Sequence, residues 1–282
     1  MLYKKIDLYE YFGQPRPKGG MGYLTCMCIS PSHEVNFSRR HPAVLVIPGG
    51  AYWFVSERES EPLALRYVQR GYSAFILEYS CAPAAAYPVA FREAAMAMLY
   101  IRKNAEALNI DPQKVAALGC SAGGHLCGCI TTMPQSEALA GLNEDAKYTV
   151  RPDAAIFCYP VITMGEKTHE GTRQNISGGN MELAASLSIE RHVTSSAPPA
   201  FIWHTRNDAD VPVANSLKLA DAYEAAGVPF ELHIYGNGVH GLSIADECVY
   251  PASEVPRHSS ALPGWVDLSI NWLAENGLKL ED

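Results

Sequence analysis

The chain has 282 residues, of which 48% are hydrophobic and 18% are charged, and its formal net charge is −8. This composition is typical of a globular protein that can bury a substantial core, and it excludes a disordered chain. The negative charge and the lack of any block of Lys and Arg argue against nucleic acid as a partner.

Neither a targeting segment nor a membrane anchor is predicted. Residues 1–7 contain no apolar stretch long enough for a signal peptide, and no other segment is long and apolar enough to predict a membrane span. We therefore expect a cytoplasmic protein without a membrane partner. The eight cysteines include two C-x-C pairs, but their spacing does not match a zinc site, so buried thiols are the expected state.

Strand-like apolar runs alternate with amphipathic helical runs along most of the chain. The predicted strands are 23–29, 43–47, 72–79, 114–118, 154–159, 200–204 and 230–235. The predicted helices are 61–70, 88–108, a segment directly after Ser121, 213–226 and 265–276. This alternation predicts an α/β fold with a doubly wound, mainly parallel sheet and helices on both faces.

The domain organisation is predicted to be simple. No repeat or linker interrupts the alternation, so we expect a single domain over residues 1–282. The stretch 163–199 is rich in glycine and in loop-forming residues, and we expect it to be an insertion that roofs the active site. In doubly wound sheets ligands bind at the carboxyl ends of the strands, which is where the motifs described next are found.

The most informative motif is Gly119-Cys120-Ser121-Ala122-Gly123-Gly124, between the strand run 114–118 and a helix-forming run. A serine between glycines at this spacing can occupy a tight strand-to-helix turn that exposes its hydroxyl above a helix N-terminus. Ser121 is therefore the predicted nucleophile. Cys120, beside it, is accessible to thiol reagents in this interpretation, and we assign it no role.

A serine hydroxyl needs an imidazole that accepts its proton and a carboxylate that orients the imidazole. His240 is the predicted base, because it lies in the glycine-rich loop 236–241 after the last predicted strand. Asp208 is the predicted acid, because it closely follows the strand 200–204. Asp210 competes with it, but Asp210 directly precedes Val211-Pro212, where an aspartate often caps or bends a turn.

The other histidines have simpler explanations. His204 and His233 lie in apolar strands and are expected to be buried core residues, and His125 is expected to pack within the helix after Ser121. The remaining four that we considered are predicted to lie in surface loops: His33, His41, His192 and His258.

An oxyanion hole needs backbone N–H groups that point at the developing negative oxygen. The residue after the nucleophile, Ala122, supplies one predicted donor. The loop Pro48-Gly49-Gly50-Ala51-Tyr52-Trp53 follows the strand 43–47 and supplies the others. We predict Gly50 and Ala51 as donors, with Gly49 needed for the shape of the loop.

Three further residues are candidates for a substrate pocket. Tyr52 and Trp53 are predicted pocket walls, and the alternative is an aromatic cluster beneath the loop. His169, in the insertion, is a predicted polar contact, as is Arg173. The alternative for this second pair is that both are solvated loop residues.

These motifs, in this order, resemble the α/β-hydrolase superfamily. The similarity is greatest to the small intracellular esterase and lipase branch, which includes acetylxylan-esterase-like and hormone-sensitive-lipase-like enzymes. It extends from about residue 20 to the C-terminus, and its motifs are specific for fold and mechanism rather than for substrate. Two departures stand out: Pro48-Gly49-Gly50-Ala51 replaces a His-Gly-Gly-Gly loop, and Cys120 replaces an aspartate, which weakens the match to the hormone-sensitive-lipase group proper.

The resemblance implies a serine carboxylesterase that hydrolyses short-chain acyl esters through an acyl-enzyme, with acetylated carbohydrates as one candidate class. It implies no metal and no organic cofactor, and a small-molecule ester as the substrate. The oligomeric state stays open, and a homo-oligomer is one option. The alternatives are a prolyl-oligopeptidase-like peptidase or amidase, for which Glu57, Glu59 and Glu61 are weak candidates to hold a substrate amine, and an inactive binding module.

Overall fold

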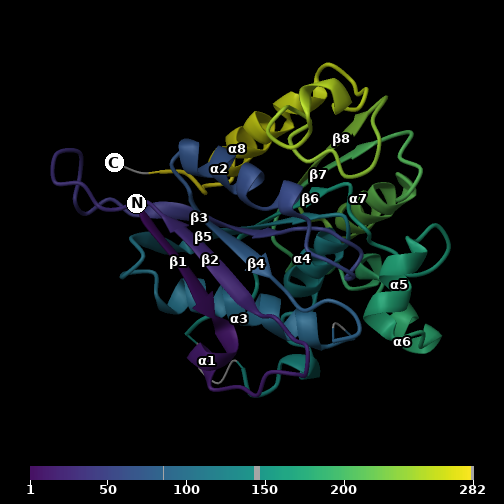
Figure 1. Cartoon of the computed structure of the whole chain (residues 1–282), viewed down its shortest axis with the longest axis horizontal. Helices are drawn as coiled ribbons and strands as arrows, with labels where there is room; N and C mark the ends of the chain where they lie inside the picture. Colours follow the sequence, from purple (N-terminus) through teal and green to yellow (C-terminus); the bar gives the residue numbers. More distant parts are fainter. Residues whose placement is uncertain (85, 143–146, 281–282) are drawn as a thin grey trace.

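The computed structural model describes residues 1–84, 86–142 and 147–280 (Figure 1). Its centre is an eight-stranded sheet in the order β1-β2-β4-β3-β5-β6-β7-β8. The strands are β1 Leu2–Asp7, β2 Tyr23–Cys28, β3 His41–Ile47, β4 Ser73–Glu78, β5 Ile110–Cys120, β6 Ala154–Cys158, β7 Ala200–Thr205 and β8 Phe230–Tyr235. β2 pairs antiparallel with both β1 and β4, and all neighbours from β4 to β8 are parallel.

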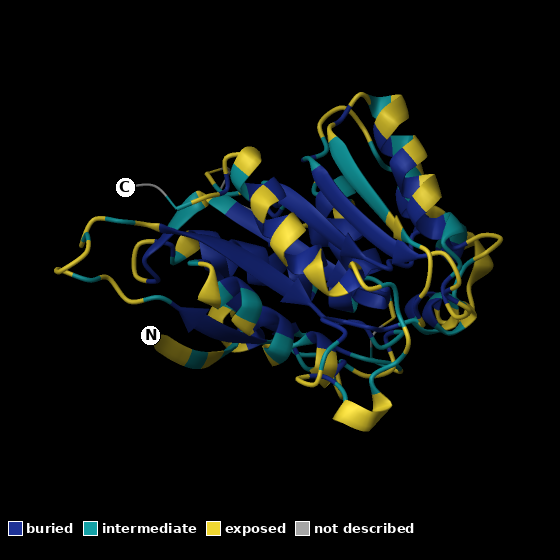
Figure 2. Ribbon diagram, turned by 90° about the horizontal axis from the view of Figure 1, so that it is seen from above, coloured by how far each residue is buried: buried dark blue, intermediate teal, exposed yellow. Residues whose placement is uncertain are grey.

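Helices cover both faces of this sheet, as the sequence predicted (Figure 1). Figure 2 shows that the central strands are largely buried, whereas the exposed residues gather on the helices and loops around them. The helices are α1 Leu8–Phe12, α2 Glu61–Gln69, α3 Val89–Lys103, α4 Ala122–Thr132, α5 Glu170–Ser177, α6 Met181–Ser186, α7 Ala214–Ala226 and α8 Trp265–Glu275. Apolar side chains of α3, α4 and α7 form one hydrophobic cluster with the sheet, and those of α2 and α8 form a second. Leu45 of β3 belongs to the first cluster and Val44 to the second, so this strand is buried on both sides. That burial explains its continuous apolar run.

The first strand, β1, is absent from the predicted elements. It is an edge strand that pairs only with β2, and three of its six residues are exposed. An edge strand without fully buried residues needs no continuous apolar run. Leu2–Asp7 therefore carries charged residues, and its sequence does not stand out as a strand.

The insertion 163–199 is more regular than the predicted loop. It contains α5, α6 and a short 3-10 helix, Ile189–Arg191. The side chain of His169 caps α5, that of Asn180 caps α6, and Gly178 ends α5 in the left-handed conformation with φ 60°. Caps of this kind stabilise short helices that lack a long apolar stripe, which is why periodicity did not reveal them.

Two histidine predictions were wrong. His41 lies at the start of β3 rather than in a surface loop, and its buried Nδ1 is 2.8 Å from the carbonyl oxygen of Gly71. His233 is partly exposed because β8 is the other edge strand, and its Nε2 pairs with Glu231. His204 is fully buried, as predicted.

The cysteines are free thiols, and six of the eight are buried. Cys120 is among the buried ones, so the predicted access to thiol reagents was wrong, and burial raises the pKa of its thiol well above the usual range. Within the described part of the chain, no group of three or more His, Cys, Asp or Glu side chains is arranged to hold a metal ion. None of the described helices combines the length and apolar character that a membrane crossing requires.

Candidate active site

Ser121 occupies the sharp turn between β5 and α4, with φ 52° and ψ −120°. This left-handed backbone conformation is strained for a residue with a side chain. The turn depends on glycine on both sides. A Cβ added at Gly119 would lie 2.3 Å from the carbonyl oxygen of Gly123, and one added at Gly123 would lie 2.1 Å from the carbonyl oxygen of Ile47. Residues 119–123 thus form the tight turn that the glycine spacing predicts.

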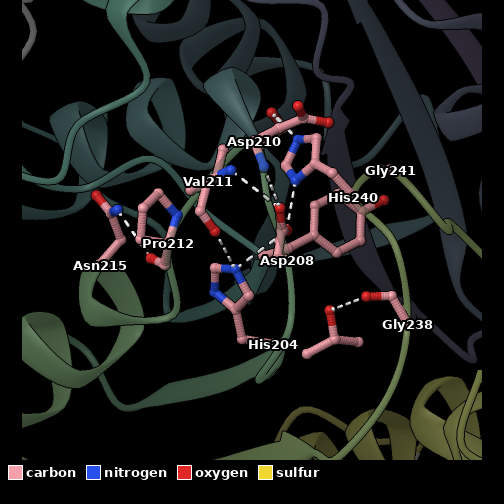
Figure 3. Close-up of polar contacts among 12 residues, drawn as sticks. His204, Asp208, Asp210, Val211, Pro212, Asn215, Gly238, His240 and Gly241 are labelled. Carbon is pink, nitrogen blue, oxygen red and sulfur yellow. Dashed lines mark hydrogen bonds and ion pairs between the residues drawn. The ribbon is translucent and has the colours of Figure 1, made fainter.

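A continuous chain of hydrogen bonds starts at this serine. The hydroxyl of Ser121 donates to Nε2 of His240 at 2.7 Å, and Nδ1–H of His240 donates to Oδ2 of Asp208 at 2.7 Å. Asp208 follows β7 and His240 follows β8, so three loops at the carboxyl ends of parallel strands meet here. Figure 3 shows the imidazole of His240 directed at the carboxylate of Asp208.

The carboxylate of Asp208 is buried and fully partnered. Its Oδ1 accepts backbone N–H groups of Asp210 at 3.0 Å and Val211 at 2.9 Å. Burial raises its pKa, but hydrogen bonds from His204 and His240 outweigh burial, and the net pKa lies well below its usual range. Asp208 is therefore ionised at neutral pH. Asp210 is exposed and contributes its backbone N–H to Asp208, so the structure places Asp208 rather than Asp210 against His240.

His204 has a contact that sequence reasoning missed. Its Nε2–H donates to the carbonyl oxygen of Val211 at 2.9 Å and lies 3.3 Å from Oδ2 of Asp208, while Nδ1 accepts from the hydroxyl of Ser216 (Figure 3). A signal was present in the sequence, because His204 lies four residues before Asp208 at the end of the same strand. The buried imidazole is thus a neighbour of the candidate site.

The glycine loop lies directly against Ser121. A Cβ added at Gly49 would lie 2.9 Å from the Cβ of Ser121. At Gly50 the backbone has φ +122°, and an added Cβ would lie 2.0 Å from the carbonyl oxygen of Phe54, so this position requires glycine.

The three backbone N–H groups predicted to form an oxyanion hole donate no hydrogen bond within the described part of the chain. Among the described residues, no acceptor takes a hydrogen bond from the N–H of Gly50 or Ala51. Ala122 is the first residue of α4, so its N–H has no acceptor within the helix. These are the donors that the sequence predicts for an oxyanion hole.

Tyr52 is not a pocket wall, and that prediction was wrong. Its side chain is fully buried beneath the glycine loop, where its hydroxyl donates to Nδ1 of His125 at 2.9 Å and its ring packs edge-on against Tyr79. The alternative, an aromatic cluster under the loop, describes it correctly. His125 in turn is fully buried, and its Nε2–H donates to the carbonyl oxygen of Leu187.

Trp53 and His169 have different surroundings. Trp53 is 66% exposed, and it lines a groove of about 720 Å³ between the β1, β2 and β4 strands and the start of α2. His169 uses Nδ1 to accept the N–H of Thr172 and cap α5. Its pKa is lowered, first by burial and then by the charge of His240.

Glu59 was considered only as a weak ligand for a substrate amine, and the structure contradicts that use. Its carboxylate is 3% exposed and accepts hydrogen bonds from the N–H of Gly49 and the hydroxyl of Tyr159, both at 2.7 Å. No sequence signal indicated this burial, because Glu59 lies between two other acidic residues, Glu57 and Glu61, in a polar run.

Comparison with known proteins reveals clear relatives. Residues 33–223 match the model of the BD-FAE family. The chain is 35% identical over 213 residues to endo-1,4-beta-xylanase B of Butyrivibrio fibrisolvens, covering 74% of this chain and 33% of that protein. It is 30% identical over 207 residues to an acetylxylan esterase of Xylanibacter ruminicola, covering 71% of this chain and 40% of that protein. The chain therefore spans less than half the length of these two relatives.

A solved structure matches over nearly the whole chain. The acetyl ester-xyloside bifunctional hydrolase from Caldicellulosiruptor lactoaceticus superposes with a TM-score of 0.79 at 36% identity, covering 91% of this chain and 89% of that one. Together with the mainly parallel sheet and its helices on both faces, these matches confirm the predicted α/β-hydrolase fold. The chain belongs to the BD-FAE family, within the esterase branch of the α/β-hydrolases.

Proposed function

We propose that this protein is a serine carboxylesterase that hydrolyses short-chain acyl esters, with acetylated carbohydrates as the favoured substrate class. The observation that carries the proposal is the unbroken hydrogen-bond chain from Ser121 through His240 to Asp208. The family relatives support the ester and the carbohydrate. One is described as an acetylxylan esterase, and the similar solved structure as an acetyl ester-xyloside bifunctional hydrolase.

In the proposed mechanism, Ser121 attacks the acyl carbonyl carbon while Nε2 of His240 accepts the hydroxyl proton. The ionised Asp208 accepts from Nδ1–H, which fixes the tautomer in which Nε2 is free to act as base, and it stabilises the imidazolium that forms. The N–H groups of Gly50, Ala51 and Ala122 stabilise the negative oxygen of the tetrahedral intermediate.

The collapse of this intermediate breaks the ester bond. Nε2–H of His240 protonates the leaving alcohol, and the acyl group stays on Ser121 as an ester. Water then attacks the acyl carbon of the acyl-enzyme while His240 accepts a proton from it. The bond between the acyl carbon and Oγ of Ser121 breaks, Nε2–H of His240 returns its proton to Oγ, and the carboxylic acid leaves. Each step uses only groups of this chain and water.

The test of this proposal is the turnover of p-nitrophenyl acetate by Ser121→Ala. Removal of a nucleophile of this kind is expected to lower kcat by about 10⁴-fold or more. Ser186→Ala, on the exposed face of α6, is the matched control and should keep wild-type activity. Ser121→Ala should also lose labelling by a fluorophosphonate probe, and equal turnover in the two variants would refute the assignment.

The substrate class needs a separate comparison. p-Nitrophenyl esters of increasing acyl length, acetylated xylose and glucose, and the matching amides should be assayed with the same enzyme. We expect acetyl esters to be cleaved fastest and amides slowest. Faster cleavage of the amides would favour the peptidase alternative.

A further inference from the structure

Glu59 is a buried carboxylate that contacts the glycine loop of the proposed oxyanion hole. Its Oε2 accepts the N–H of Gly49 at 2.7 Å, one residue before the proposed donor Gly50. This bond closes the loop onto the 3-10 helix Glu57–Glu59. Because the side chain is only 3% exposed, little water competes for it, and the hydrogen bond is stronger than it would be at the surface.

The second oxygen of Glu59 is connected by hydrogen bonds, through Tyr159, to the loop that carries His240. Oε1 accepts the hydroxyl of Tyr159 at 2.7 Å, and the same hydroxyl oxygen accepts the N–H of Ser243 at 3.0 Å. Burial raises the pKa of Tyr159 well above its usual range, so the phenol stays protonated and keeps donating. Ser243 lies three residues after His240, in the same loop.

Two further contacts connect the same segments. The hydroxyl of Ser243 donates to the carbonyl oxygen of Arg58 at 2.7 Å. The ring of Tyr159 packs edge-on against the imidazole of His240, with the ring centroids 5.1 Å apart. The chain Gly49–Glu59–Tyr159–Ser243 therefore joins the two loops that flank Ser121.

We propose that Glu59, acting through Tyr159, is a positioning residue that holds the oxyanion-hole loop and the His240 loop in their active arrangement around Ser121. This inference rests on the proposed function. Neither residue exchanges a proton with the substrate or with Ser121 in this proposal, and Tyr159 contacts the site only by packing its ring against His240. Their effect is geometric, and a misplacement of about 1 Å at a catalytic group can cost about 10²-fold in rate.

A second buried carboxylate provides a matched control. Glu93 is fully buried and, like Glu59, accepts one backbone N–H, that of Ser80 at 2.6 Å, and one tyrosine hydroxyl, that of Tyr9 at 2.8 Å. It also accepts the hydroxyl of Ser80. It joins α1 to the residues after β4 and contacts neither of the two loops. If substitution of Glu59 lowers activity only because it damages the core, the same substitution of Glu93 should lower activity equally.

The experiment compares Glu59→Gln, Tyr159→Phe and their double variant with Glu93→Gln and Tyr9→Phe. Gly49 and Tyr159 donate to different oxygens of Glu59, and in Glu59→Gln one of these oxygens becomes an NH2 donor, so one of the two hydrogen bonds loses its acceptor. Tyr159→Phe removes the hydroxyl and keeps the ring against His240. Folding is checked by circular dichroism and denaturant unfolding, and kcat and KM are measured on the folded proteins with p-nitrophenyl acetate.

We expect kcat to fall about 10- to 100-fold in Glu59→Gln and in Tyr159→Phe, with KM changed by less than about threefold. The double variant should lose no more than the worse single variant, because both break one chain. The two control variants should keep kcat within about twofold of wild type.

Three results would overturn the inference: a wild-type kcat in folded Glu59→Gln, losses that multiply in the double variant, or an equal loss in Glu93→Gln. If Glu59→Gln does not fold, Tyr159→Phe alone decides by the same criterion. Ser121→Ala separates this inference from the proposed function. If Ser121→Ala is inactive while Glu59→Gln is unaffected, only the positioning role fails, whereas an active Ser121→Ala refutes the proposed function itself.

Discussion

At the scale of single residues, the candidate site contains a strained backbone turn at Ser121 and a buried, ionised carboxylate at Asp208. Ser121 is held at φ 52° because glycines at 119 and 123 let β5, α4 and the glycine loop approach one another closely. Asp208 keeps its charge although it is buried, because two histidines and two backbone N–H groups face its oxygens. A buried carboxylate with fewer partners would be protonated more easily and would orient His240 less firmly.

The pair Asp208 and Asp210 provides a residue-scale prediction. In Asp208→Asn the amide does not select the tautomer of His240 that accepts from Ser121, so kcat should fall by about 10⁴-fold. Asp210→Asn keeps the backbone N–H that Asp208 accepts, and its side chain is exposed, so kcat should stay within about threefold of wild type. Turnover of p-nitrophenyl acetate by the two variants checks this, and an equal loss in both would contradict the choice of Asp208.

At the scale of elements, the insertion is attached to the glycine loop through α5. The side-chain amide of Asn175 donates to the carbonyl oxygen of Ala51 at 2.8 Å, next to the proposed oxyanion donors. The carbonyl oxygen of Ile176 accepts the N–H of Tyr87. A segment that holds the loop from outside in this way can influence both the rate and the choice of substrate, and we propose that it covers the site.

Asn175→Ala tests this attachment. Removal of one such hydrogen bond is worth about 1 kcal/mol, so kcat/KM for p-nitrophenyl acetate should fall about fivefold while the fold persists. Asn180→Ala is the matched control. It removes the side chain that caps α6, which should cost about 1 kcal/mol of unfolding free energy and leave kcat/KM unchanged. Equal activity in the two variants would show that α5 does not position the loop.

At the scale of the whole molecule, one sheet carries a hydrophobic cluster on each face, and we propose that residues 1–282 form one domain on this ground. His125 connects parts of this domain that are far apart in sequence. It lies in α4, accepts from Tyr52 of the glycine loop and donates to Leu187 of the insertion. Burial lowers its pKa to about 4, so it is neutral in the folded protein.

This lowered pKa predicts a pH dependence of stability. The unfolded chain protonates His125 near its ordinary pKa of 6.5, whereas the folded protein does so only near 4. The unfolded state therefore binds more protons between these values, and the free energy of unfolding falls as pH drops through this window. At pH 5 the loss relative to pH 7 should be about 2 kcal/mol from this residue.

Denaturant unfolding at pH 7 and pH 5 measures the effect. Other groups also titrate in this range, so the comparison is with His125→Gln, which carries no titrating imidazole at this position. The variant is expected to be less stable at pH 7 and to lose less of its stability between pH 7 and pH 5. A pH dependence identical to that of wild type would contradict the assignment to His125.

The sequence predicted those parts of the fold that depend on residues close to one another along the chain. Strands such as 43–47 and 200–204 are buried on both faces and therefore stand out as apolar runs. The serine turn and the glycine loop were predictable because close backbone approach demands glycine at fixed positions. β1 was missed because an edge strand needs no such run, and α5 and α6 because caps rather than periodicity stabilise them.

The sequence by itself therefore determined the α/β-hydrolase fold and the set of residues that compete for each role at the site. Only the tertiary structure placed Asp208 rather than Asp210 against His240, buried Tyr52 beneath its loop, and brought Glu59 against Tyr159. The physical reason is that periodicity and backbone conformation are properties of neighbouring residues. Hydrogen bonding and burial of a polar side chain depend on groups that the folded chain brings together from distant positions.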